Sequence, residues 1–403
     1  MLGSEPRCRR QKLLHLNPDK ERYFLMIAEK ISFVNYRNIE KAQIEFCDGV
    51  NLIYGDNAKG KTNVLEAVYS YARGKSFRSA SERELVRFGC EGYHTELVFR
   101  DKNRVQSMSL GYADKKRQKK INGVVCDKLS DMIGRFRAVM FCPEHLDIVK
   151  GGPGQRREFL NIAISQLDGT YIKEFSKYKA ILENRNALLR RISICDDPKK
   201  KGALSAQLDI FSTQLSECAA YICAAREKYI RGISPFAEFF LGEMSEDSEK
   251  LSLEYECDID KSIRDDTEKS SSQYLSKLRQ NTEREAAVGA TLYGIHRDDI
   301  KICINSVDAR SFASQGQQRS IALSLKMAEG EMSRECVGEY PVFLFDDVLS
   351  ELDVKRRSYL MSKISDRQLI ITSCEISDIR DVEGARFIKA LGGGIYEASD
   401  RIL

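Results

Sequence analysis

Three features that would indicate a membrane span, an export signal or a disulfide framework are missing from this sequence of 403 residues. No apolar run reaches the length of about 20 residues that a membrane span needs. The first 25 residues carry charges throughout and lack the apolar core of a signal peptide. The twelve cysteines are scattered and include no C-x-x-C pair. Free thiols in a reducing compartment fit this pattern better than disulfides or a zinc site, so we expect a cytoplasmic protein with no membrane partner.

A strong excess of charge of one sign is also missing. Lys and Arg number 64 against 60 Asp and Glu, which gives a formal net charge of +4. The chain as a whole therefore has no strongly attractive field for a polyanion, and any contact with nucleic acid must come from local clusters. No basic stripe is interleaved with aromatic residues, so we expect a DNA contact to involve the phosphate backbone and to be largely independent of sequence.

Patterned sequence begins at Met26, with "MIAEKISFVNYRNI". The length allows two domains or one large one, with enough apolar residues for a core. We expect residues 1–25 to be a disordered extension or a start-site artefact.

A phosphate-binding loop is indicated by "NLIYGDNAKGKTNVLEAVYSYARG", which combines an apolar strand, a loop and an amphipathic helix. The loop has the form G-x-x-x-x-G-K-T in the context that the P-loop motif requires. Its backbone N–H groups can face a phosphate, Lys61 can reach the β and γ phosphates of ATP, and Thr62 can ligate Mg²⁺. The loop comprises Gly55, Asp56, Asn57, Ala58, Lys59, Gly60, Lys61 and Thr62. A glycine-rich turn without function is the alternative that these flanks disfavour.

A carboxylate for the metal is supplied by "YPVFLFDDVLSELD", an apolar run that ends in Asp346 and Asp347. The run predicts a parallel strand buried on both faces, with Asp346 beside the P-loop at the edge where ligands of open α/β sheets collect. We assign Asp346 to Mg²⁺ and Asp347 to polarising the attacking water. The alternative is a solvated Asp pair that ends a buried strand. A later run, "RQLIITSCE", predicts a further parallel strand ending at Thr372 and Ser373.

A helical hairpin is predicted between these two halves. From Tyr171 onward, apolar residues recur in a 4-3 alternation that is interrupted at Arg185 and broken by the polar "DDPKKKG". Two seams of period 3.5 joined by a Pro-containing turn predict an antiparallel coiled coil over about residues 171–230, ending at Gly232 and Pro235. With roughly 25 residues per leg at about 1.5 Å each, the arm is on the order of 40 Å long. The alternative is a pair of core helices in an ordinary helical domain.

Basic residues form three further local clusters. One lies between strand-like segments, as in a hairpin, and the other two, a pair of arginines and the run Lys199-Lys200-Lys201, lie at the two ends of the first predicted helix. The functional interpretation of these clusters is contact with phosphate. The alternative is that they are solvated loops, and for each cluster taken separately this alternative is slightly favoured. The candidates for DNA contact are Lys115, Lys116, Arg117, Lys119, Lys120, Arg156 and Arg157.

The stretch Ser314-Gln315-Gly316-Gln317 precedes a well-patterned helix in "FASQGQQRSIALSLKMAEGE". It resembles the S-x-G-Q/E signature that ABC-type ATPases place before a helix, shortly before the strand that carries the metal-binding aspartate. An ATP site whose halves lie near residues 60 and 346, separated by a helical hairpin, resembles the ABC-type ATPases of chromosome maintenance.

Longer blocks resemble the RecF family of bacterial DNA replication and repair proteins. They include "GKSFRSASERELVRFG", "YGIHRDDI" and "FLFDDVLSELDVKRR", and the blocks run from about residue 31 to 375 in the family's order. We therefore expect an α/β fold with an ABC-type P-loop ATPase head, in which helices pack on a mixed sheet. The head is expected to combine residues 26–150 and 290–403, and the inserted helical arm domain to span residues 151–289.

This resemblance implies a cytoplasmic, weak, DNA-dependent ATPase that uses ATP and Mg²⁺ and dimerises head to head around two nucleotides. It implies binding to gapped DNA or single-strand/double-strand junctions, cooperation with RecR and RecO to direct RecA onto gaps, and a link to SOS induction. By residue, it implies that Ser314, Gln315, Gly316 and Gln317 act on the partner's ATP. It further implies that Asp353 belongs to the loop crossing the dimer interface, and that Arg37 and Asn38 reach the nucleotide.

Four positions depart from related patterns. Asp347 replaces the usual glutamate, and its shorter side chain suggests slow hydrolysis. Ser373 stands where many ABC-type ATPases have a histidine, and Glu144 stands near the expected glutamine. Ile295 replaces the usual proline before His296. For His296, a structural role is the alternative to a role in the site.

Three other classes of protein are less consistent with the sequence. Another SMC-like ATPase of the cohesion type would need arms of hundreds of residues. The ATPase subunit of an ABC transporter would lack the hairpin and would act with a membrane protein. A small-molecule P-loop kinase would need neither the signature nor a dimer.

Overall fold

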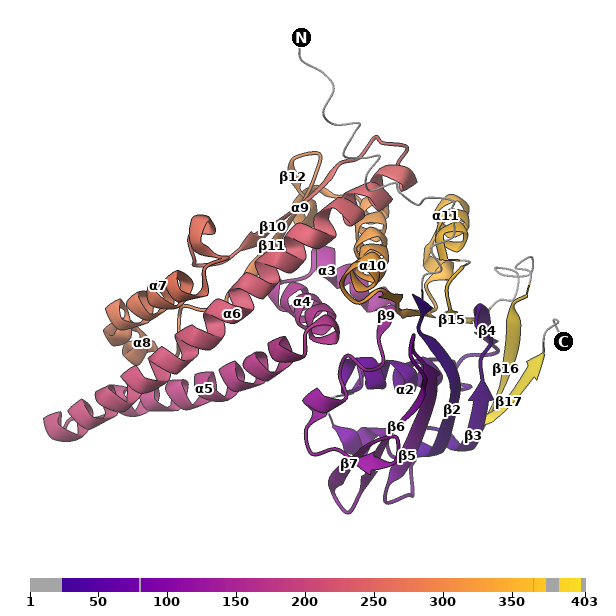
Figure 1. Cartoon of the computed structure of the whole chain (residues 1–403), viewed down its shortest axis with the longest axis horizontal. Helices are drawn as coiled ribbons and strands as arrows, with labels where there is room; N and C mark the ends of the chain where they lie inside the picture. Colours follow the sequence, from indigo (N-terminus) through magenta and orange to yellow (C-terminus); the bar gives the residue numbers. More distant parts are fainter. Residues whose placement is uncertain (1–23, 80, 365, 375–383, 400–403) are drawn as a thin grey trace, which may run out of the picture.

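The computed structural model describes residues 24–403 except 80, 365, 375–383 and 400–403 (Figure 1). The extension predicted for residues 1–25 lies outside the described residues except for its last two. These form β1 (Phe24–Leu25), which pairs parallel with β13 (Glu339–Tyr340). Among the helices of the described part, none is long and apolar enough to cross a membrane.

A six-stranded mixed sheet forms the centre of the head. In spatial order its strands are β17 (Ile395–Ser399), β16 (Arg386–Gly392), β4 (Val50–Tyr54), β15 (Leu369–Ser373), β14 (Val342–Asp346) and β9 (Ala138–Phe141). All neighbours are parallel except β16 and β17. Strands β4, β14 and β15 are buried along their whole lengths, as expected for strands covered on both faces. The expected α/β head is confirmed.

A second six-stranded sheet is antiparallel throughout. Its order is β3 (Ile39–Glu45), β2 (Ile27–Tyr36), β5 (Tyr93–Arg100), β6 (Val105–Ala113), β7 (Lys116–Ile121) and β8 (Val124–Val125). Helix α2 (Lys61–Arg73) lies between the two sheets, because its Val64 and Val68 share one core with Leu97 of β5 and Leu344 of β14. The other face of the mixed sheet is covered mainly by α4 (Pro153–Leu167) and α10 (Gln315–Val337).

Helices α5 (Gly169–Ser193) and α6 (Pro198–Met244) form the predicted antiparallel hairpin and extend away from the head (Figure 1). The Asp197 carboxylate caps α6 by accepting hydrogen bonds from the backbone N–H groups of Lys199 and Lys200. Pro198 occupies the first turn of α6, where its missing N–H would have no helical partner. The polar break of the sequence is therefore the turn of the hairpin.

The hairpin is not a bare coiled coil. Helix α7 (Thr267–Gln280) packs on α6, and α8 (Thr282–Val288) packs on α5. At the interruption of the seam, Arg185 is fully buried and donates hydrogen bonds to Ser212, Thr291 and Glu285, the last of which lies on α8. The arm is therefore a protruding hairpin supported by a small bundle, which combines the two arrangements that the sequence left open.

The predicted end of the hairpin is wrong, because α6 continues through Gly232 and Pro235 to Met244. This inner part of α6 packs against α10, and its Ile233, Ala237 and Leu241 are almost fully buried. Tertiary packing here outweighs the hydrogen bond that a proline removes from a helix interior.

A three-stranded antiparallel sheet lies where the arm meets the head. It consists of β10 (Leu251–Glu256), β11 (Asp299–Ile304) and β12 (Val307–Asp308). Strand β10 contacts α6, and β11 contacts α4. The short helices α3 (Asp147–Lys150) and α9 (Ala309–Phe312) and the longer α11 (Val354–Ile364) complete the head.

Candidate functional site

The P-loop connects β4 to α2 and turns sharply at two glycines. Gly55 has a φ of 139°, and a Cβ there would lie 2.6 Å from the carbonyl oxygen of Ala390. Gly60 is the N-cap of α2 with a φ of 97°, and a Cβ there would lie 2.9 Å from the Tyr396 hydroxyl. Only glycine combines positive φ with such close approach. The loop thereby leaves the N-terminus of α2 open to a ligand, in the arrangement that suits a phosphate.

A cavity of about 840 Å³ lies in front of this helix N-terminus. Its walls come from the P-loop, from Arg37 and Asn38 in the β2–β3 turn, and from Asp347 and Thr372 at the carboxyl ends of β14 and β15. Segments that are remote in sequence therefore meet here. The volume lies within the range of small-molecule and cofactor sites.

The side chains of Lys61 and Thr62 point in different directions from the start of α2. Lys61 Nζ donates hydrogen bonds to the carbonyl oxygens of Gly55 at 2.5 Å and Asp56 at 2.9 Å, so the ammonium is held over the loop. Thr62 Oγ1 donates to Asp346 Oδ1 at 2.8 Å. The structure thus brings together the two residues predicted to hold Mg²⁺. They come from segments that are not adjacent, because β15 lies between β4, which leads into the P-loop, and β14, which ends at Asp346.

The carboxylate of Asp346 is largely buried at the end of β14. Thr372 Oγ1 also donates a hydrogen bond to Asp346 Oδ1, at 2.7 Å. Burial raises the pKa of Asp346, and the hydrogen bonds from Thr372 and Thr62 act against that rise. Hydroxyl and carboxylate oxygens are the ligands that Mg²⁺ prefers, so these residues fit the ion.

Asp347 is exposed, in contrast to its buried neighbour. Its φ is 52°, and its backbone N–H donates to the carbonyl oxygen of Thr372 at 3.3 Å and to Thr372 Oγ1 at 3.1 Å. This turn directs Asp347 away from Asp346 and into the wall of the cavity. Its assignment to the attacking water stays a prediction.

Arg37 and Asn38 reach the cavity from the first hairpin, but both are already engaged. Arg37 makes a two-pronged ion pair with the buried Glu66, with distances of 3.0 and 2.6 Å. Asn38 Nδ2 donates to the carbonyl oxygen of Ala58 at 3.1 Å and so braces the P-loop. Their predicted contact with nucleotide is compatible with these positions and stays a prediction.

The signature segment lies at the start of α10 and does not line this cavity. Ser314 is the N-cap, and Ser314 and Gln317 form a capping box in which each side-chain oxygen accepts a hydrogen bond from the other residue's backbone N–H. Ser314 and Gln315 are exposed, and Gly316 is half-buried. These side chains therefore cap the start of α10 and leave its N-terminal end accessible from solvent.

A guanidinium links the signature helix to the loop of Asp353. Arg356 forms an ion pair with Asp353, and its Nε donates to Ser320 Oγ at 2.8 Å. A Cβ at Gly316 would lie 3.5 Å from Arg356 Nη2. The structure thus joins the signature and the predicted interface loop into one surface, away from the P-loop of the same chain.

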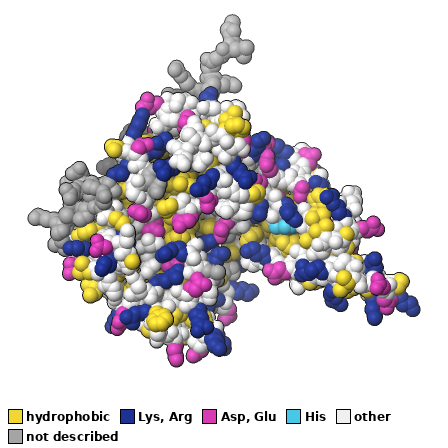
Figure 2. Space-filling model, turned by 180° about the vertical axis from the view of Figure 1, so that it is seen from behind, with side chains coloured by type: hydrophobic (Ala, Val, Ile, Leu, Met, Phe, Trp, Pro, Cys, Tyr) yellow, Lys and Arg dark blue, Asp and Glu magenta, His cyan; other side chains and the backbone are white. Residues whose placement is uncertain are grey.

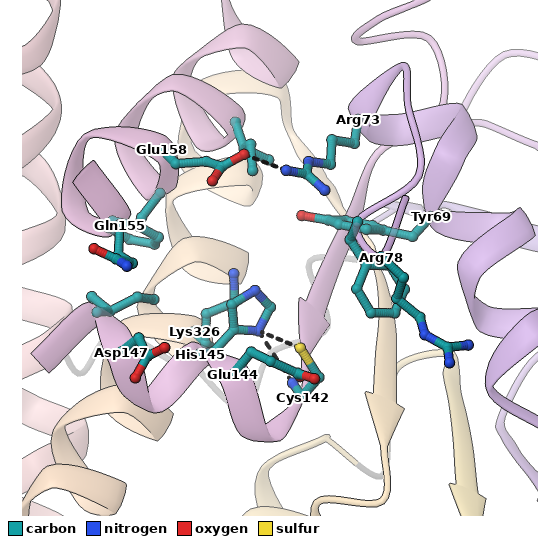
Figure 3. A pocket seen from close by; sticks show the side chains of 14 residues that line it. Tyr69, Arg73, Arg78, Cys142, Glu144, His145, Asp147, Gln155, Glu158 and Lys326 are labelled. Carbon is teal, nitrogen blue, oxygen red and sulfur yellow. Dashed lines mark hydrogen bonds and ion pairs between the residues drawn. The ribbon is translucent and has the colours of Figure 1, made fainter. Parts of the chain in front are cut away.

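A second cavity of about 460 Å³ lies between α2, α4 and the segment that follows β9 (Figure 3). Glu144, the residue near the expected glutamine position, is in its wall, and Arg73 of α2 forms an ion pair with Glu158 of α4 across it. The His145 imidazole is partly buried, and desolvation together with the nearby charges of Lys326 and Arg73 lowers its pKa.

The other two departures from the family pattern, at Ser373 and beside His296, lie in well-packed parts of the head and arm. Ser373 is buried at the end of β15. His296 lies 2.6 Å from the Tyr178 hydroxyl and 3.1 Å from the carbonyl oxygen of Thr291, and burial lowers its pKa. The structural alternative for His296 is therefore favoured.

The predicted basic hairpin is formed by β6 and β7. Lys115 lies in its turn, and Lys115, Lys116 and Lys120 are exposed. Arg117 pairs with Glu82 at 3.2 Å, and Lys119 Nζ donates to the carbonyl oxygen of Asp127. The three exposed lysines are thus the residues of this cluster best placed to meet a phosphate.

The prediction that Arg156 contacts DNA is wrong. Its side chain is 5% exposed and makes two hydrogen bonds to the Asp299 carboxylate, at 2.6 and 2.8 Å. Arg157 is half-buried, and its Nη1 donates to the carbonyl oxygen of Asp298. These arginines join α4 to β11, which explains a basic pair without a surface role.

Several residues that the sequence did not single out also line the cavity in front of the α2 N-terminus. Among them are Arg78, Phe88 and Cys374. The Phe88 ring is fully exposed, and the Cys374 thiol donates to Asn57 Oδ1 at 3.0 Å. Arg78 and Phe88 both fall within the block "GKSFRSASERELVRFG", which was the available signal for them, and Cys374 directly follows the strand that was predicted to end at Ser373.

Comparisons with known proteins agree with this geometry. Residues 27–389 match the family model described as the RecF/RecN/SMC N terminal domain. The DNA replication and repair protein RecF of Ruminiclostridium cellulolyticum is 39% identical over 375 residues, which is 92% of this chain and 99% of that protein. RecF of Bacillus velezensis is 36% identical, over 88% of this chain and 95% of its own.

Solved structures are similar over the same extent. The recombination mediator protein RecF-ATPrS in the RecFOR pathway matches with a TM-score of 0.86 and 35% identity, over 93% of this chain and 99% of that chain. RecF-ATP in the same pathway matches with a TM-score of 0.85. The Smc head domain from Pyrococcus furiosus, at 14% identity and a TM-score of 0.54, shares the fold alone.

Proposed function

Because the chain belongs to the RecF family of DNA replication and repair proteins, we propose that it binds and slowly hydrolyses ATP and uses this cycle to hold and release DNA at single-strand gaps. The observation that carries the proposal is the contact between Thr62 and Asp346 at the mouth of the P-loop. Two hard oxygen ligands meet there beside an open helix N-terminus, which is the arrangement that a magnesium–triphosphate complex requires. The RecF-ATP structures, at 35% identity, support the same ligand.

The residues of the cavity divide the chemistry between them. Thr62 and Asp346 would hold Mg²⁺, which when bound neutralises charge on the β and γ phosphates. Lys61 exchanges the loop carbonyls for phosphate oxygens, because a charged acceptor makes the stronger hydrogen bond. Asp347, exposed at the wall, orients and polarises the attacking water.

The second half of each site is supplied by another copy of the chain. The signature residues Ser314 and Gly316 are exposed or half-buried, lie outside the cavity of their own chain, and adjoin Asp353 through Arg356. In a head-to-head dimer, the Ser314 hydroxyl and the Gly316 backbone N–H would contact the γ phosphate held by the partner's P-loop. Loss of that phosphate removes interface contacts, so hydrolysis weakens the dimer and releases DNA.

DNA contact is assigned to local clusters rather than to the protein as a whole. Figure 2 shows Lys and Arg interspersed with Asp and Glu over the visible face, as the net charge of +4 leads one to expect. The exposed lysines of the β6–β7 hairpin are Lys115, Lys116 and Lys120. They supply contacts to phosphate without base recognition, which suits gapped DNA and strand junctions of any sequence.

The cellular role proposed for the chain follows its family. We place it in the cytoplasm with RecO and RecR, where it directs RecA onto single-stranded gaps and is linked to SOS induction. The match to RecF in the RecFOR pathway supports this placement. The ABC transporter alternative has less support, because residues 27–389 match the RecF/RecN/SMC model and the arm is intact.

The proposal is tested by ATP turnover on DNA of different structure. Turnover is measured with gapped duplex, with intact duplex of the same sequence and without DNA, while dimerisation is followed by sedimentation. We expect gapped DNA to stimulate turnover more than intact duplex, and ATP to shift the protein to a dimer. Equal turnover with and without DNA, or a monomer at saturating ATP, would contradict the proposal.

A further inference from the structure

Two thiols are in contact where α6 passes the three-stranded sheet. Cys223 lies in α6, and Cys257 directly follows β10. Their Sγ atoms are 3.7 Å apart, which is a van der Waals contact between two sulfur atoms that also share a hydrogen bond. Cys223 is fully buried, whereas Cys257 is partly open to solvent. Of the two cysteines, Cys257 is therefore the one that is nearer to solvent, and Cys223 is the buried partner.

A metal ion does not account for this pair. Within the part of the chain that the structure describes, no group of three or more His, Cys, Asp or Glu side chains could hold a metal. The pair also lies outside the nucleotide cavity. Other short side chains could fill the same space, so packing alone does not explain why both positions are cysteine.

The surroundings favour the thiolate at Cys257. The hydrogen bond between the two thiols holds the pKa of Cys257 below its ordinary value, although burial acts against this. The Arg264 guanidinium donates to the carbonyl oxygens of Tyr255 and Ile259, on either side of Cys257, and so holds a positive charge beside the sulfur. Asp298 opposes this with its negative charge. The hydrogen bond with Cys257 and the burial of the side chain raise the pKa of Cys223.

We propose that Cys223 and Cys257 are a redox-active pair, which a hydroperoxide converts to a reversible intrachain disulfide. The Cys257 thiolate attacks one peroxide oxygen, the O–O bond breaks, and a sulfenic acid forms as hydroxide leaves. The Cys223 sulfur then attacks the Cys257 sulfur, the S–O bond breaks, and the departing hydroxide takes the Cys223 proton. Two thiols and one hydrogen peroxide thus give one disulfide and two waters, and a dithiol reductant restores the pair.

The position of the pair indicates what the bond would do. A disulfide requires a sulfur separation of about 2.0 Å, so the sulfurs need to approach by somewhat less than about 2 Å. Cys257 lies beyond the end of its strand, on a connecting segment that can supply this movement. One turn along α6 from Cys223, Arg226 is fully buried and pairs with Asp298 at 2.8 Å. Oxidation would therefore fasten the sheet to α6 beside this buried ion pair.

The test uses the reduced full-length chain and hydrogen peroxide. After treatment, peptide mapping without reductant should give a Cys223–Cys257 linkage, intact mass should show the loss of two hydrogen atoms per linkage, and dithiothreitol should reverse both. Cys257→Ser should abolish the linkage. Cys223→Ser leaves no second thiol, so a sulfenic acid should accumulate at Cys257 and be trapped by dimedone. Cys336→Ser, which removes an exposed cysteine elsewhere, should leave the linkage intact.

Two outcomes would overturn the proposal. One is the absence of the linkage at a peroxide dose that already oxidises Cys336. The other is a linkage that survives in Cys257→Ser through a different cysteine. If Cys223→Ser folds poorly, thermal melting of the wild type decides instead, because oxidation should raise its melting temperature and dithiothreitol should return it. An unchanged melting temperature after complete oxidation would contradict the fastening of α6. These tests do not depend on the proposed ATPase function.

Discussion

Lys61 is the single residue whose replacement should most directly separate nucleotide binding from folding. Its Nζ donates hydrogen bonds to the carbonyl oxygens of Gly55 and Asp56 and to the Cys374 sulfur, all at the P-loop or beside it. Lys61→Ala should therefore weaken ATP binding by at least about tenfold while leaving the melting temperature close to that of the wild type. Titration with a fluorescent ATP analogue and thermal melting measure the two effects. Lys75→Ala, which removes an exposed lysine beyond the other end of α2, is the control and should bind normally.

Asp347 should act on hydrolysis rather than on binding, because it is exposed at the wall of the cavity. Asp347→Asn keeps the shape of the side chain but removes its negative charge. We expect turnover to fall by about 10²-fold while ATP affinity is retained, so that a dimer persists on DNA. Single-turnover hydrolysis and DNA retention in a competitor chase measure this. Wild-type turnover in Asp347→Asn would remove Asp347 from the role of base.

At the residue scale, the sequence was informative where a motif determines both the backbone conformation and the position of a side chain. The P-loop spacing located Lys61 and Thr62 correctly, and the apolar strand located Asp346. It failed for Arg156, because a surface arginine and an arginine buried against Asp299 give the same letter. Phe88 belongs to a block that resembles the family, but no spacing relates it to the P-loop, so its place in the cavity wall depends on tertiary folding.

At the scale of secondary structure, the buried ion pair between Arg185 of α5 and Glu285 of α8 should hold the arm's bundle together. Both side chains are 0% exposed, and their closest atoms are 2.7 Å apart. Arg185→Ala would leave a buried carboxylate without its partner, so the free energy of unfolding should fall by about 3–5 kcal/mol. Chemical denaturation measures this. Arg191→Ala, an exposed change in the same helix, should alter it by no more than about 0.5 kcal/mol.

A double replacement distinguishes the ion pair from packing. If the loss in Arg185→Ala comes from an uncompensated charge, then Arg185→Met combined with Glu285→Leu should recover much of the stability. A double variant as unstable as Arg185→Ala would instead indicate that the hydrogen bonds to Ser212 and Thr291 are the main contribution.

The β6–β7 hairpin provides the test of DNA contact at this scale. Replacing Lys115, Lys116 and Lys120 together with alanine should lower DNA affinity similarly for all sequences. It should reduce the slope of log affinity against log salt by about 2 to 3, because each phosphate contact contributes about 0.9. Fluorescence anisotropy over a series of salt concentrations measures both. Replacing Lys199, Lys200 and Lys201 at the arm tip removes the same charge, and an equal effect there would move the interface to the arm.

Helix boundaries show why elements are predicted less well than motifs. The seam of α5 and α6 was evident because its period repeats over many residues. The end of α6 was not, because the packing of Ile233 and Leu241 against α10 decides whether the helix passes Pro235. That information lies in a segment about a hundred residues away along the chain.

At the scale of the whole molecule, mixing of inactive variants tests whether each ATP site is shared between two chains. Lys61→Ala retains an intact signature, and Ser314→Ala retains an intact P-loop. Each alone should have little activity, whereas an equal mixture should recover up to about a quarter of wild-type turnover, because half of the dimers then contain one complete site. A mixture of Lys61→Ala with Asp346→Ala, both altered on the P-loop side, is the control. No recovery in the first mixture, with dimers present, would place the signature outside the partner's site.

The order of strands in the mixed sheet has a consequence for synthesis on the ribosome. Strand β4, which leads into the P-loop, lies between β15 and β16, and both come from the last part of the chain. While the nascent polypeptide is still short, β4 therefore has neither of its neighbours, and its apolar face must remain exposed or be shielded by a chaperone. The antiparallel sheet and the arm draw their strands and helices from nearby sequence and can form earlier. Translation is thus nearly complete before the cavity in front of the P-loop can close, and a truncated product lacking residues beyond 369 would lack the wall that Thr372 and Cys374 supply.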